Sequence, residues 1–233
     1  SLQKKILKKM KSLKYKKKIC IVTSSRAEFG ILKSIIKNLK KSSKIRLELI
    51  LTGAHFMSKF GNTYKEIADS GIKSFSKIIT SQKNNNSNDI SFSSSNLLKK
   101  ISEIFFSKRY DLIILLGDRY ETLIAAYAAT LNKIPIAHLF GGDETVGAYD
   151  NQFRHSISKF SHVHFVTNEI SKKRLIRMGE DPSNIFNFGN PSLDNIYSKN
   201  KISKKKMENK LRIKFRLKNF IVTYHPETLS STQ

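Results

Sequence analysis

Charged and titratable residues follow directly after the apolar runs of this sequence. Asp118 and Arg119 come after the run at 112–116, Asp143 and Glu144 come after the run at 134–139, and Arg26 comes shortly after the run at 19–22. Carboxylates can transfer protons to or from a bound molecule, and an arginine can hold an anionic oxygen. The placement of these residue types therefore indicates a site of acid–base chemistry.

Several of these residues also have a simpler structural explanation. Asp118 could cap the helix that follows it, and His138, inside an apolar run, is better explained as a core histidine than as a catalyst. His55 stays undecided between the two. The Gly-rich turn at 141–147 has neither G-x-x-x-x-G-K-[ST] nor G-x-G-x-x-G spacing, so the sequence predicts neither a P-loop nor a dinucleotide-binding fingerprint.

The elements that must position these residues alternate along the chain. Short apolar runs and amphipathic stretches follow one another, which is typical of βαβ units around a parallel sheet. Residues 81–95, rich in Asn and Ser, are predicted to form a loop. We predict strands at 19–22, 47–51, 72–79, 112–116, 134–139, 162–166 and 220–224, and helices at 29–40, 61–70, 96–107, 121–131, 151–159 and 169–178.

In parallel α/β sheets, ligands bind outside the carboxyl ends of the strands. The titratable residues come after the predicted strands, so they are expected to meet at one edge of the sheet. The chain divides into a basic N-terminal tail at 1–16, an N-terminal α/β domain at 17–196, a Lys-rich linker or crossover helix at 197–218, and residues 219–233. The last segment is expected to begin a second domain that is cut off.

Composition limits the classes of partner. The sequence has 43 Lys and Arg against 18 Asp and Glu, a net charge of +25, but Lys dominates and is spread through helices and tails. We interpret this as a solvated Lys coat and expect no nucleic-acid partner. The single cysteine, Cys20, excludes an internal disulfide and fits a reducing cytoplasm. No apolar run is long enough to predict a membrane span.

Six motifs occur in a fixed order along the chain, and together they point to a resemblance to one family. They are Thr23-Ser24-Ser25-Arg26-Ala27-Glu28, Gly117-Asp118-Arg119-Tyr120-Glu121, Pro135 to Asp143 (PIAHLFGGD), Gly147-Ala148-Tyr149-Asp150 with Arg154-His155-Ser156-Ile157-Ser158-Lys159, Gly189-Asn190-Pro191-Ser192-Leu193-Asp194, and Tyr224-His225-Pro226. From about residue 17 to residue 227 the chain resembles the hydrolysing UDP-N-acetylglucosamine 2-epimerases of sialic and legionaminic acid synthesis. Where that family usually has Gly-Gly-Glu, this chain has Gly141-Gly142-Asp143, a carboxylate one methylene shorter.

The resemblance implies a fold and a reaction. The fold is the N-terminal Rossmann-like half of a GT-B-type enzyme, whose active site lies in the cleft between two such halves. The implied reaction eliminates UDP from UDP-N-acetylglucosamine across C1–C2 to give a 2-acetamidoglucal. Water then adds at C1 and a proton reaches the opposite face of C2, which gives UDP and N-acetylmannosamine. No cofactor or metal is implied, and a homodimer is expected.

The resemblance also assigns roles to residues. Asp118, Asp143 and Asp150 are the candidates for proton transfer, and His225 would assist the leaving group or orient the sugar. Substrate-binding roles are predicted for Arg26, which would clamp the diphosphate, and for Arg119, Glu121, Gly142, Arg154 and His155. Arg154 lies one helical turn after Asp150 and is expected to orient it.

Other interpretations remain open from the sequence alone. The sugar could be a UDP-2,4-diacetamido-2,4,6-trideoxyhexose, as in legionaminic acid synthesis, and the motifs do not separate the two. A non-hydrolysing epimerase would add UDP back, but the residue sequence of the Gly-Asp-Arg and Gly-Ala-Tyr-Asp motifs favours the hydrolysing branch. The remaining alternatives are an inactive truncated chain and a basic nucleic-acid-binding module.

Overall fold

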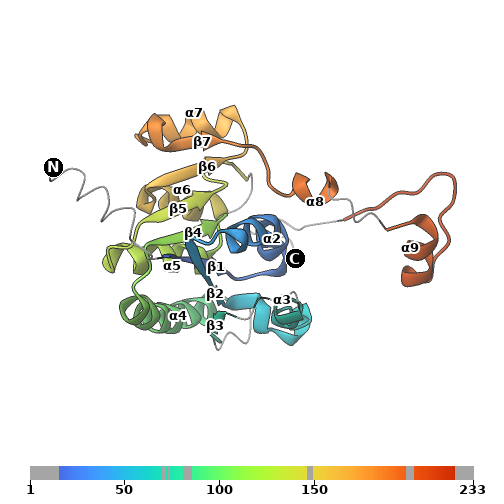
Figure 1. Cartoon of the computed structure of the whole chain (residues 1–233), viewed down its shortest axis with the longest axis horizontal. Helices are drawn as coiled ribbons and strands as arrows, with labels where there is room; N and C mark the ends of the chain where they lie inside the picture. The colour runs from blue at the N-terminus through green and yellow to red at the C-terminus, as the bar shows by residue number, and fades with distance from the viewer. Residues whose placement is uncertain are drawn as a thin grey trace.

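A parallel sheet of seven strands, in the order β3-β2-β1-β4-β5-β6-β7, organises the fold in this computed structural model (Figure 1). The structure describes residues 16–69, 72, 74–80, 86–145, 149–197 and 202–223. The strands are β1 (Lys17–Thr23), β2 (Ile45–Leu51), β3 (Phe75–Lys77), β4 (Leu112–Leu116), β5 (Ile136–Leu139), β6 (Val163–Val166) and β7 (Ile185–Asn187). Every neighbouring pair is parallel, which confirms the predicted Rossmann-like α/β class.

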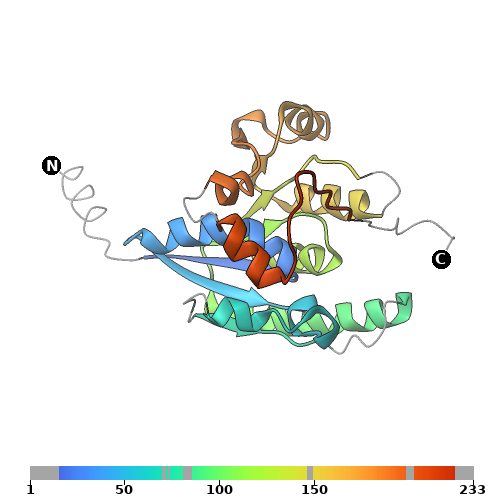
Figure 2. The same cartoon turned by 90° about the vertical axis from the view of Figure 1, so that its right-hand side faces the viewer.

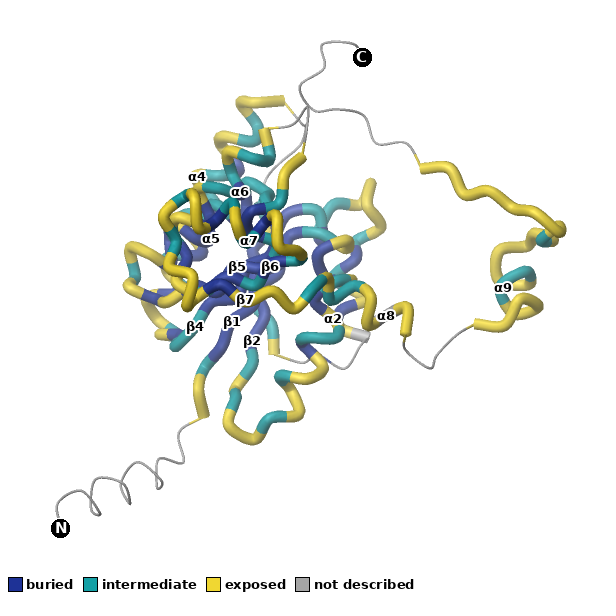
Figure 3. The backbone as a smooth tube through the Cα atoms, turned by 90° about the horizontal axis from the view of Figure 1, so that it is seen from above, coloured by how far each residue is buried: buried dark blue, intermediate teal, exposed yellow. Residues whose placement is uncertain are grey.

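The central strands are apolar because helices cover both faces of the sheet. In β4, Ile113, Ile114, Leu115 and Leu116 are all buried. Cys20 of β1 lies fully buried at the centre of the sheet, where burial raises the pKa of its thiol well above the usual range. Figure 3 shows that the buried residues concentrate in these strands.

The helices divide between the two faces. On one face, α2 (Arg26–Lys41) and α3 (Tyr64–Asp69) pack through residues such as Leu32 and Ile67. On the other face, α4 (Ser87–Lys108), α5 (Tyr120–Leu131) and α6 (Asp150–Phe160) pack through residues such as Phe105, Ala125 and Ile157. Figure 2 shows the long α4, coloured green, along one side of the fold. Helix α7 (Glu169–Arg177) packs Leu175 onto β6 and β7.

Three further short segments have the 3-10 conformation, at Gly53–Phe56, Ser58–Phe60 and Pro182–Asn184. After β7 come α8 (Leu193–Tyr197) and α9 (Lys204–Leu211). Helix α9 buries none of its residues, and Figure 1 shows it set apart from the sheet. The predicted linker helix at 197–218 is thus realised only at Lys204–Leu211 among the described residues.

The predicted loop at 81–95 is wrong from residue 87 onward, because α4 begins there. Asn86 caps the helix by accepting a hydrogen bond from the backbone of Asp89 at 2.8 Å. The hydroxyls of Ser91 and Ser94 donate to carbonyls one turn earlier, so these polar side chains are satisfied inside a helix. Packing of the later turns on the sheet extends the helix through residues of low helix propensity.

Two strand predictions differ from the structure, and one strand was missed. Among the described residues of the predicted strand at 72–79, Phe75–Lys77 form β3, and the three-residue β7 was not predicted. Residues 220–223 of the predicted strand at 220–224 form no strand and are exposed, while Tyr224 lies outside the described residues. A strand needs a ladder partner, and none lies beside 220–223 in the part of the chain that the structure describes.

Candidate active site

The sheet reverses its order of connection between β1 and β4. The chain leaves β1 for α2 on one face and leaves β4 for α5 on the other face. Crevices form at such a point, outside the carboxyl ends of the strands, and ligands bind there in α/β folds. The residues predicted to do chemistry after β1, β4 and β5 are brought to this edge.

Asp118, directly after β4, forms an ion pair with Arg154 of α6. The Arg154 side chain is only 7% exposed and the Asp118 side chain 23% exposed. The guanidinium also donates to Thr145 at 3.2 Å and to Asn151 at 3.3 Å, while its Nε is buried without a hydrogen-bond partner. Asp118 is therefore held by a fixed charge, and part of its carboxylate reaches the surface.

The predicted pairing of Arg154 with Asp150 is wrong. Arg154 lies on the face of α6 that packs on the sheet, with Ile157 and Ser158, so its side chain points toward the end of β4. Asp150, the first residue of α6, is instead close to the positive charge of Arg119. Burial raises the pKa of Asp150, and the charge of Arg119 opposes that shift. A carboxyl group with a raised pKa is suited to hold and deliver a proton.

Arg119 is presented to this edge by two buried carboxylates. It donates to both oxygens of Glu121, at 3.0 and 2.9 Å, and its Nε lies 3.9 Å from Glu28. The Glu121 side chain is only 1% exposed, whereas that of Arg119 is 39% exposed. Of this pair, Arg119 is thus the side chain that a bound molecule can reach, and Glu121 fixes its position. Burial raises the pKa of Glu28, which the charge of Arg119 partly offsets.

Glu28 belongs to the capping box that starts α2. Its carboxylate accepts hydrogen bonds from the backbone of Ser24 at 2.6 Å and from the hydroxyl of Thr23 at 3.1 Å, while the Ser25 side chain caps the backbone of Glu28. The loop after β2 closes on the same cluster, since a Cβ at Gly53 would lie 2.5 Å from Glu121. This packing fixes the loop after β1 against the loop after β4.

The loop after β5 carries Asp143. One carboxylate oxygen of Asp143 accepts hydrogen bonds from the hydroxyls of Thr167 and Ser171, at 2.8 and 2.5 Å. Arg174 donates to the carbonyl of Gly142 and to the carboxylate of Glu144. The loop carrying this predicted catalytic residue is therefore docked on α7.

The two histidines nearest this edge are buried and neutral. Burial lowers the pKa of His138 and of His55 to about 4. Nε2 of His138 donates to the carbonyl of Gly117 at 2.8 Å, and Nδ1 lies 3.1 Å from the hydroxyl of Ser158, which confirms the core-histidine interpretation. His55 bridges the hydroxyls of Thr23 and Thr63. Both hold the strand ends together.

Three predicted site residues either lie apart from this cluster or lie outside the described residues. Arg26, at the start of α2, is exposed and pairs with Glu66 at 3.2 Å. His225 lies outside the described residues, as do Gly147 and Ala148. His155 is partly buried on α6, where burial and the charge of Arg154 lower its pKa, and its Nδ1 is buried without a hydrogen-bond partner.

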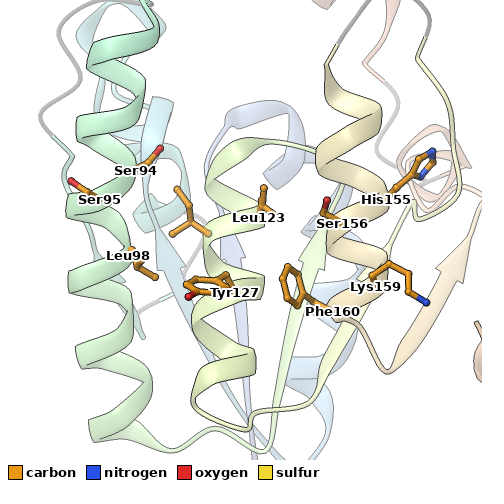
Figure 4. Close-up of a pocket in the computed structure, with 10 residues that line it drawn as sticks. Ser94, Ser95, Leu98, Leu123, Tyr127, His155, Ser156, Lys159 and Phe160 are labelled. Atoms are coloured by element: carbon orange, nitrogen blue, oxygen red, sulfur yellow. The ribbon is translucent and has the colours of Figure 1, made fainter. Parts of the chain in front are cut away.

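His155 also lines a separate groove of about 730 Å³ between α4, α5 and α6 (Figure 4). The groove is mainly apolar, with Leu98, Leu123, Tyr127 and Phe160 along it. It opens on the helical face of the fold and contains none of the predicted carboxylates.

Among the described residues, no helix is long and apolar enough to cross a membrane.

The sequence left some of the site's supporting residues unnoticed. Glu28 carried a readable signal, the Ser-x-x-Glu spacing of a capping box. Asn151, which exchanges hydrogen bonds of 2.8 and 2.9 Å with the backbone of Thr145, carried none. Ser171 and Arg174 lie within a helix and follow no strand directly, so strand-end reasoning could not find them.

Comparisons with known proteins identify the family. The family model for UDP-N-acetylglucosamine 2-epimerase matches residues 37–233. The chain is 40% identical over 215 residues to the GDP/UDP-N,N'-diacetylbacillosamine 2-epimerase (hydrolyzing) of Campylobacter jejuni, covering 92% of this chain and 56% of that protein. It is 37% identical over 216 residues to the polysialic acid biosynthesis protein P7 of Escherichia coli, covering 92% of this chain and 55% of that protein.

Solved structures agree on the fold. The UDP-GlcNAc 2-epimerase of Neisseria meningitidis, solved with bound UDP-GlcNAc, aligns with a TM-score of 0.70 at 21% identity, over 84% of this chain and 53% of that one. The chain thus spans about half the length of the relatives that it matches. The motifs at the strand ends, the Rossmann-like sheet and the family match lead to one conclusion: the chain belongs to the UDP-N-acetylglucosamine 2-epimerase family.

Proposed function

We propose that the complete gene product is a hydrolysing 2-epimerase that converts UDP-N-acetylglucosamine and water into UDP and N-acetylmannosamine. The observation that carries this proposal is the cluster at the carboxyl edge of the sheet. There Asp118 is ion-paired with Arg154, and the charge of the half-buried Arg119, itself paired with Glu121, acts on the pKa of Asp150. Relatives that match most of the chain are hydrolysing 2-epimerases by name, which supports the same reaction.

The proposed reaction has two steps, an elimination and a hydration. In the first step, a carboxylate takes the proton from C2, the bond between C1 and the UDP oxygen breaks, and a C1=C2 double bond forms. In the second step, the hydroxyl of a water molecule adds at C1 and a proton is delivered to the opposite face of C2. The net reaction consumes one water and releases UDP and the free sugar inverted at C2. Both steps need acids and bases within hydrogen-bond reach of C2.

The three aspartates have different environments, which fits different roles. Asp118 is ion-paired with the guanidinium of Arg154, which fixes the orientation of its carboxylate and suits a group that accepts a proton. Burial raises the pKa of Asp150, which suits a group that delivers a proton. Asp143 is oriented by two hydroxyl donors and is proposed to act on the water or on the sugar.

The leaving diphosphate needs positive charge at the same edge. Arg119 is proposed to contact a diphosphate oxygen, because its side chain is 39% exposed and its orientation is fixed by Glu121. Arg26 is the second candidate, since it lies at the start of α2 and its partner Glu66 is itself exposed. His225 is proposed to assist the leaving group.

A second substrate is favoured by the identity of the relatives. The Legionella pneumophila UDP-N,N'-diacetylbacillosamine 2-epimerase (hydrolyzing) is 41% identical over 180 residues, covering 77% of this chain and 48% of that protein. A Campylobacter jejuni protein of similar name is 40% identical. A UDP-2,4-diacetamido-2,4,6-trideoxyhexose is therefore the alternative substrate, with the same chemistry at C1 and C2.

Proton NMR of the complete gene product in D2O tests both the reaction and the sugar. We expect UDP and a free C2-inverted sugar that carries deuterium at C2, from one of the two substrates offered side by side. Deuterium at C2 follows from elimination and re-protonation. Release of UDP with protium retained at C2 would contradict the elimination, and turnover of neither sugar would contradict the proposed function.

The partners and location are also proposals. We propose a homodimer, on the basis of the family resemblance, and light scattering of the complete gene product measures the oligomeric state directly. We propose no nucleic-acid partner, because the excess of Lys is distributed rather than clustered. A cytoplasmic location is proposed from the single, buried cysteine.

A further inference from the structure

The loop between β5 and α6 touches α7 backbone to backbone. Gly142 has a left-handed φ of +77°, and a Cβ at this position would lie 2.3 Å from the carbonyl oxygen of Ser171. No side chain fits in that space, so the loop can approach the helix only with glycine here. This contact sets how closely the backbone of the next residue, Asp143, approaches α7.

The carboxylate of Asp143 is then held from one side only. The hydroxyls of Thr167 and Ser171 both donate to Oδ1, at 2.8 and 2.5 Å. Within the part of the chain that the structure describes, no hydrogen bond reaches Oδ2 of Asp143. One oxygen is therefore fixed by Thr167 and by Ser171 of α7, while the side chain as a whole is only half-buried. Hydrogen bonds to a charged group are among the stronger ones in proteins.

Arg174 donates hydrogen bonds to both residues that flank Asp143 in the loop. One end of its guanidinium donates to the carbonyl of Gly142, and the other end donates to the carboxylate of Glu144 at 2.6 Å. A planar guanidinium presents its donors in a fixed fork, so this pair of contacts sets both position and orientation. The Arg174 side chain is 24% exposed and that of Glu144 is 54% exposed, so the contact with Gly142 is the better shielded of the two.

The platform that provides these contacts is itself anchored. Asn168 caps α7 by accepting a hydrogen bond from the backbone of Ser171 at 2.9 Å. Leu175, one turn later, is fully buried against Val166 of β6 and Ile185 of β7. Ser171 and Arg174 therefore belong to a capped helix packed on the sheet, and Thr167 lies directly between β6 and that helix, as accurate placement of a reactive group requires.

We propose that Thr167, Ser171 and Arg174 are positioning residues for the reaction, and that α7 aims Oδ2 of Asp143 at the substrate. This inference rests on the proposed catalytic role of Asp143. Displacing a reacting group by about 1 Å can cost on the order of 100-fold in rate. The three side chains act through Asp143 and need not contact the sugar.

Paired hydroxyl variants of the complete gene product test the proposal first. Thr167→Val keeps the shape of the side chain and removes the hydroxyl, whereas Thr167→Ser keeps the hydroxyl. We expect T167V and S171A each to lower kcat by about 10-fold to 100-fold with KM changed little, and T167S to retain near-normal kcat. Equal activity of T167V and T167S would overturn the role of this hydroxyl.

Arg174 has a matched control on the same helix. Arg177 is exposed and lies in the last turn of α7. We expect Arg174→Gln to lower kcat by about 10-fold or more, and Arg174→Lys to recover only part of the loss, because an ammonium lacks the planar fork. Arg177→Gln should behave as the unchanged protein. Equal effects of R174Q and R177Q would contradict a specific grip on the loop.

A double-mutant cycle with Asp143→Asn separates positioning from general stability. If the three residues act through Asp143, then S171A and R174Q should cost little further kcat once D143N is present. Additive losses in that background would overturn the proposal. Full activity of D143N itself would instead refute the catalytic role of Asp143, whereas a weak D143N together with normal T167V, S171A and R174Q would refute only the positioning.

Discussion

At the amino end of the sheet, Glu48 accepts hydrogen bonds from Lys108 and Tyr110, each at 2.9 Å, and Lys18 and Arg46 lie within 3.9 Å of it. At the carboxyl end, Asp118 pairs with Arg154, whose Nε is buried without a hydrogen-bond partner. The Glu48 side chain is 5% exposed and that of Asp118 is 23% exposed.

The same residue types thus serve two purposes in one sheet. Burial alone would raise the pKa of Glu48, but the hydrogen bonds from Lys108 and Tyr110 outweigh it and keep that pKa below its usual value. This carboxylate is saturated by its partners and is buried too deeply for a ligand to reach. At the other end, Glu28 and Glu121 are buried in the same way, but Asp118 keeps part of its surface, as the proposed chemistry requires. The strand end at which a charged cluster lies therefore predicts its role better than its composition does.

The largest effect is expected for Asp118→Asn. The amide cannot act as a base, so kcat of the complete gene product should fall by about 100-fold to 10,000-fold. The thermal unfolding midpoint should fall as well, because Asp118 is the charged partner of a guanidinium whose side chain is only 7% exposed. Steady-state release of UDP, followed beside a thermal melt, measures both quantities. Near-normal turnover would place the base elsewhere.

Replacing Gly142 by Ala should affect both stability and rate. The new Cβ would collide with the Ser171 carbonyl, so the Asp143 loop must move and kcat should drop by about 100-fold. Gly61 supplies the control, since it also has a left-handed φ, +82°, but nothing lies within 4 Å of its Cβ position. Gly61→Ala should cost about 1 kcal/mol of stability and leave kcat unchanged. A G142A enzyme that melts lower but turns over normally would separate the loop from the chemistry.

Glu48→Gln should lower stability and leave kcat nearly unchanged, unlike D118N. Removing the charge weakens the hydrogen bonds that Lys108 and Tyr110 donate to this buried side chain, so the free energy of unfolding should fall by about 1–3 kcal/mol. The proposed site lies at the other end of the sheet, so kcat should stay within about two-fold. Urea titration and UDP release decide this, and a loss of kcat that exceeds the loss of stability would break the comparison between the two ends.

The buried histidines give the smallest effect, a dependence of stability on pH. His138 has a pKa of about 4 when folded and an ordinary value of 6.5, so its contribution is complete above pH 6.5. Between about pH 6.5 and 4 the unfolded chain binds a proton that the folded chain does not, and stability falls as the pH falls. In His138→Gln, the slope of unfolding free energy against pH should decrease by up to about 1.4 kcal/mol per unit. An unchanged slope in urea titrations from pH 7 to pH 5 would show that His138 does not titrate there.

Much of the fold could be predicted because strong local signals agree with it. The run at 112–116 is a buried strand at the predicted residues, and α6 starts one residue before its prediction. Prediction failed where distant contacts outweigh local preference. The serines at the start of α4 satisfy their hydroxyls on the helix itself, and the three-residue β7 gains its identity from pairing with β6.

The candidate site was predictable to a similar degree. Strand ends located Asp118, Arg119 and Asp143, since parallel strands bring their carboxyl ends to one edge. The pairing of Asp118 with Arg154 was not predictable, because 36 residues separate the two and the direction of the arginine depends on how α6 packs. The same reason hid Arg174, which reaches its loop across the end of β6.

The reactivity of Cys20 can report how often the buried centre of the sheet becomes accessible to solvent. Cys20 is the only cysteine in the sequence and is fully buried between β2 and β4. Because only a thiolate reacts with alkylating agents, and burial keeps this thiol protonated, labelling requires the helices that cover Cys20 to separate from the sheet. The rate of Cys20 labelling in native buffer therefore counts these openings. It needs no engineered probe, and substrate binding at the carboxyl edge should slow it.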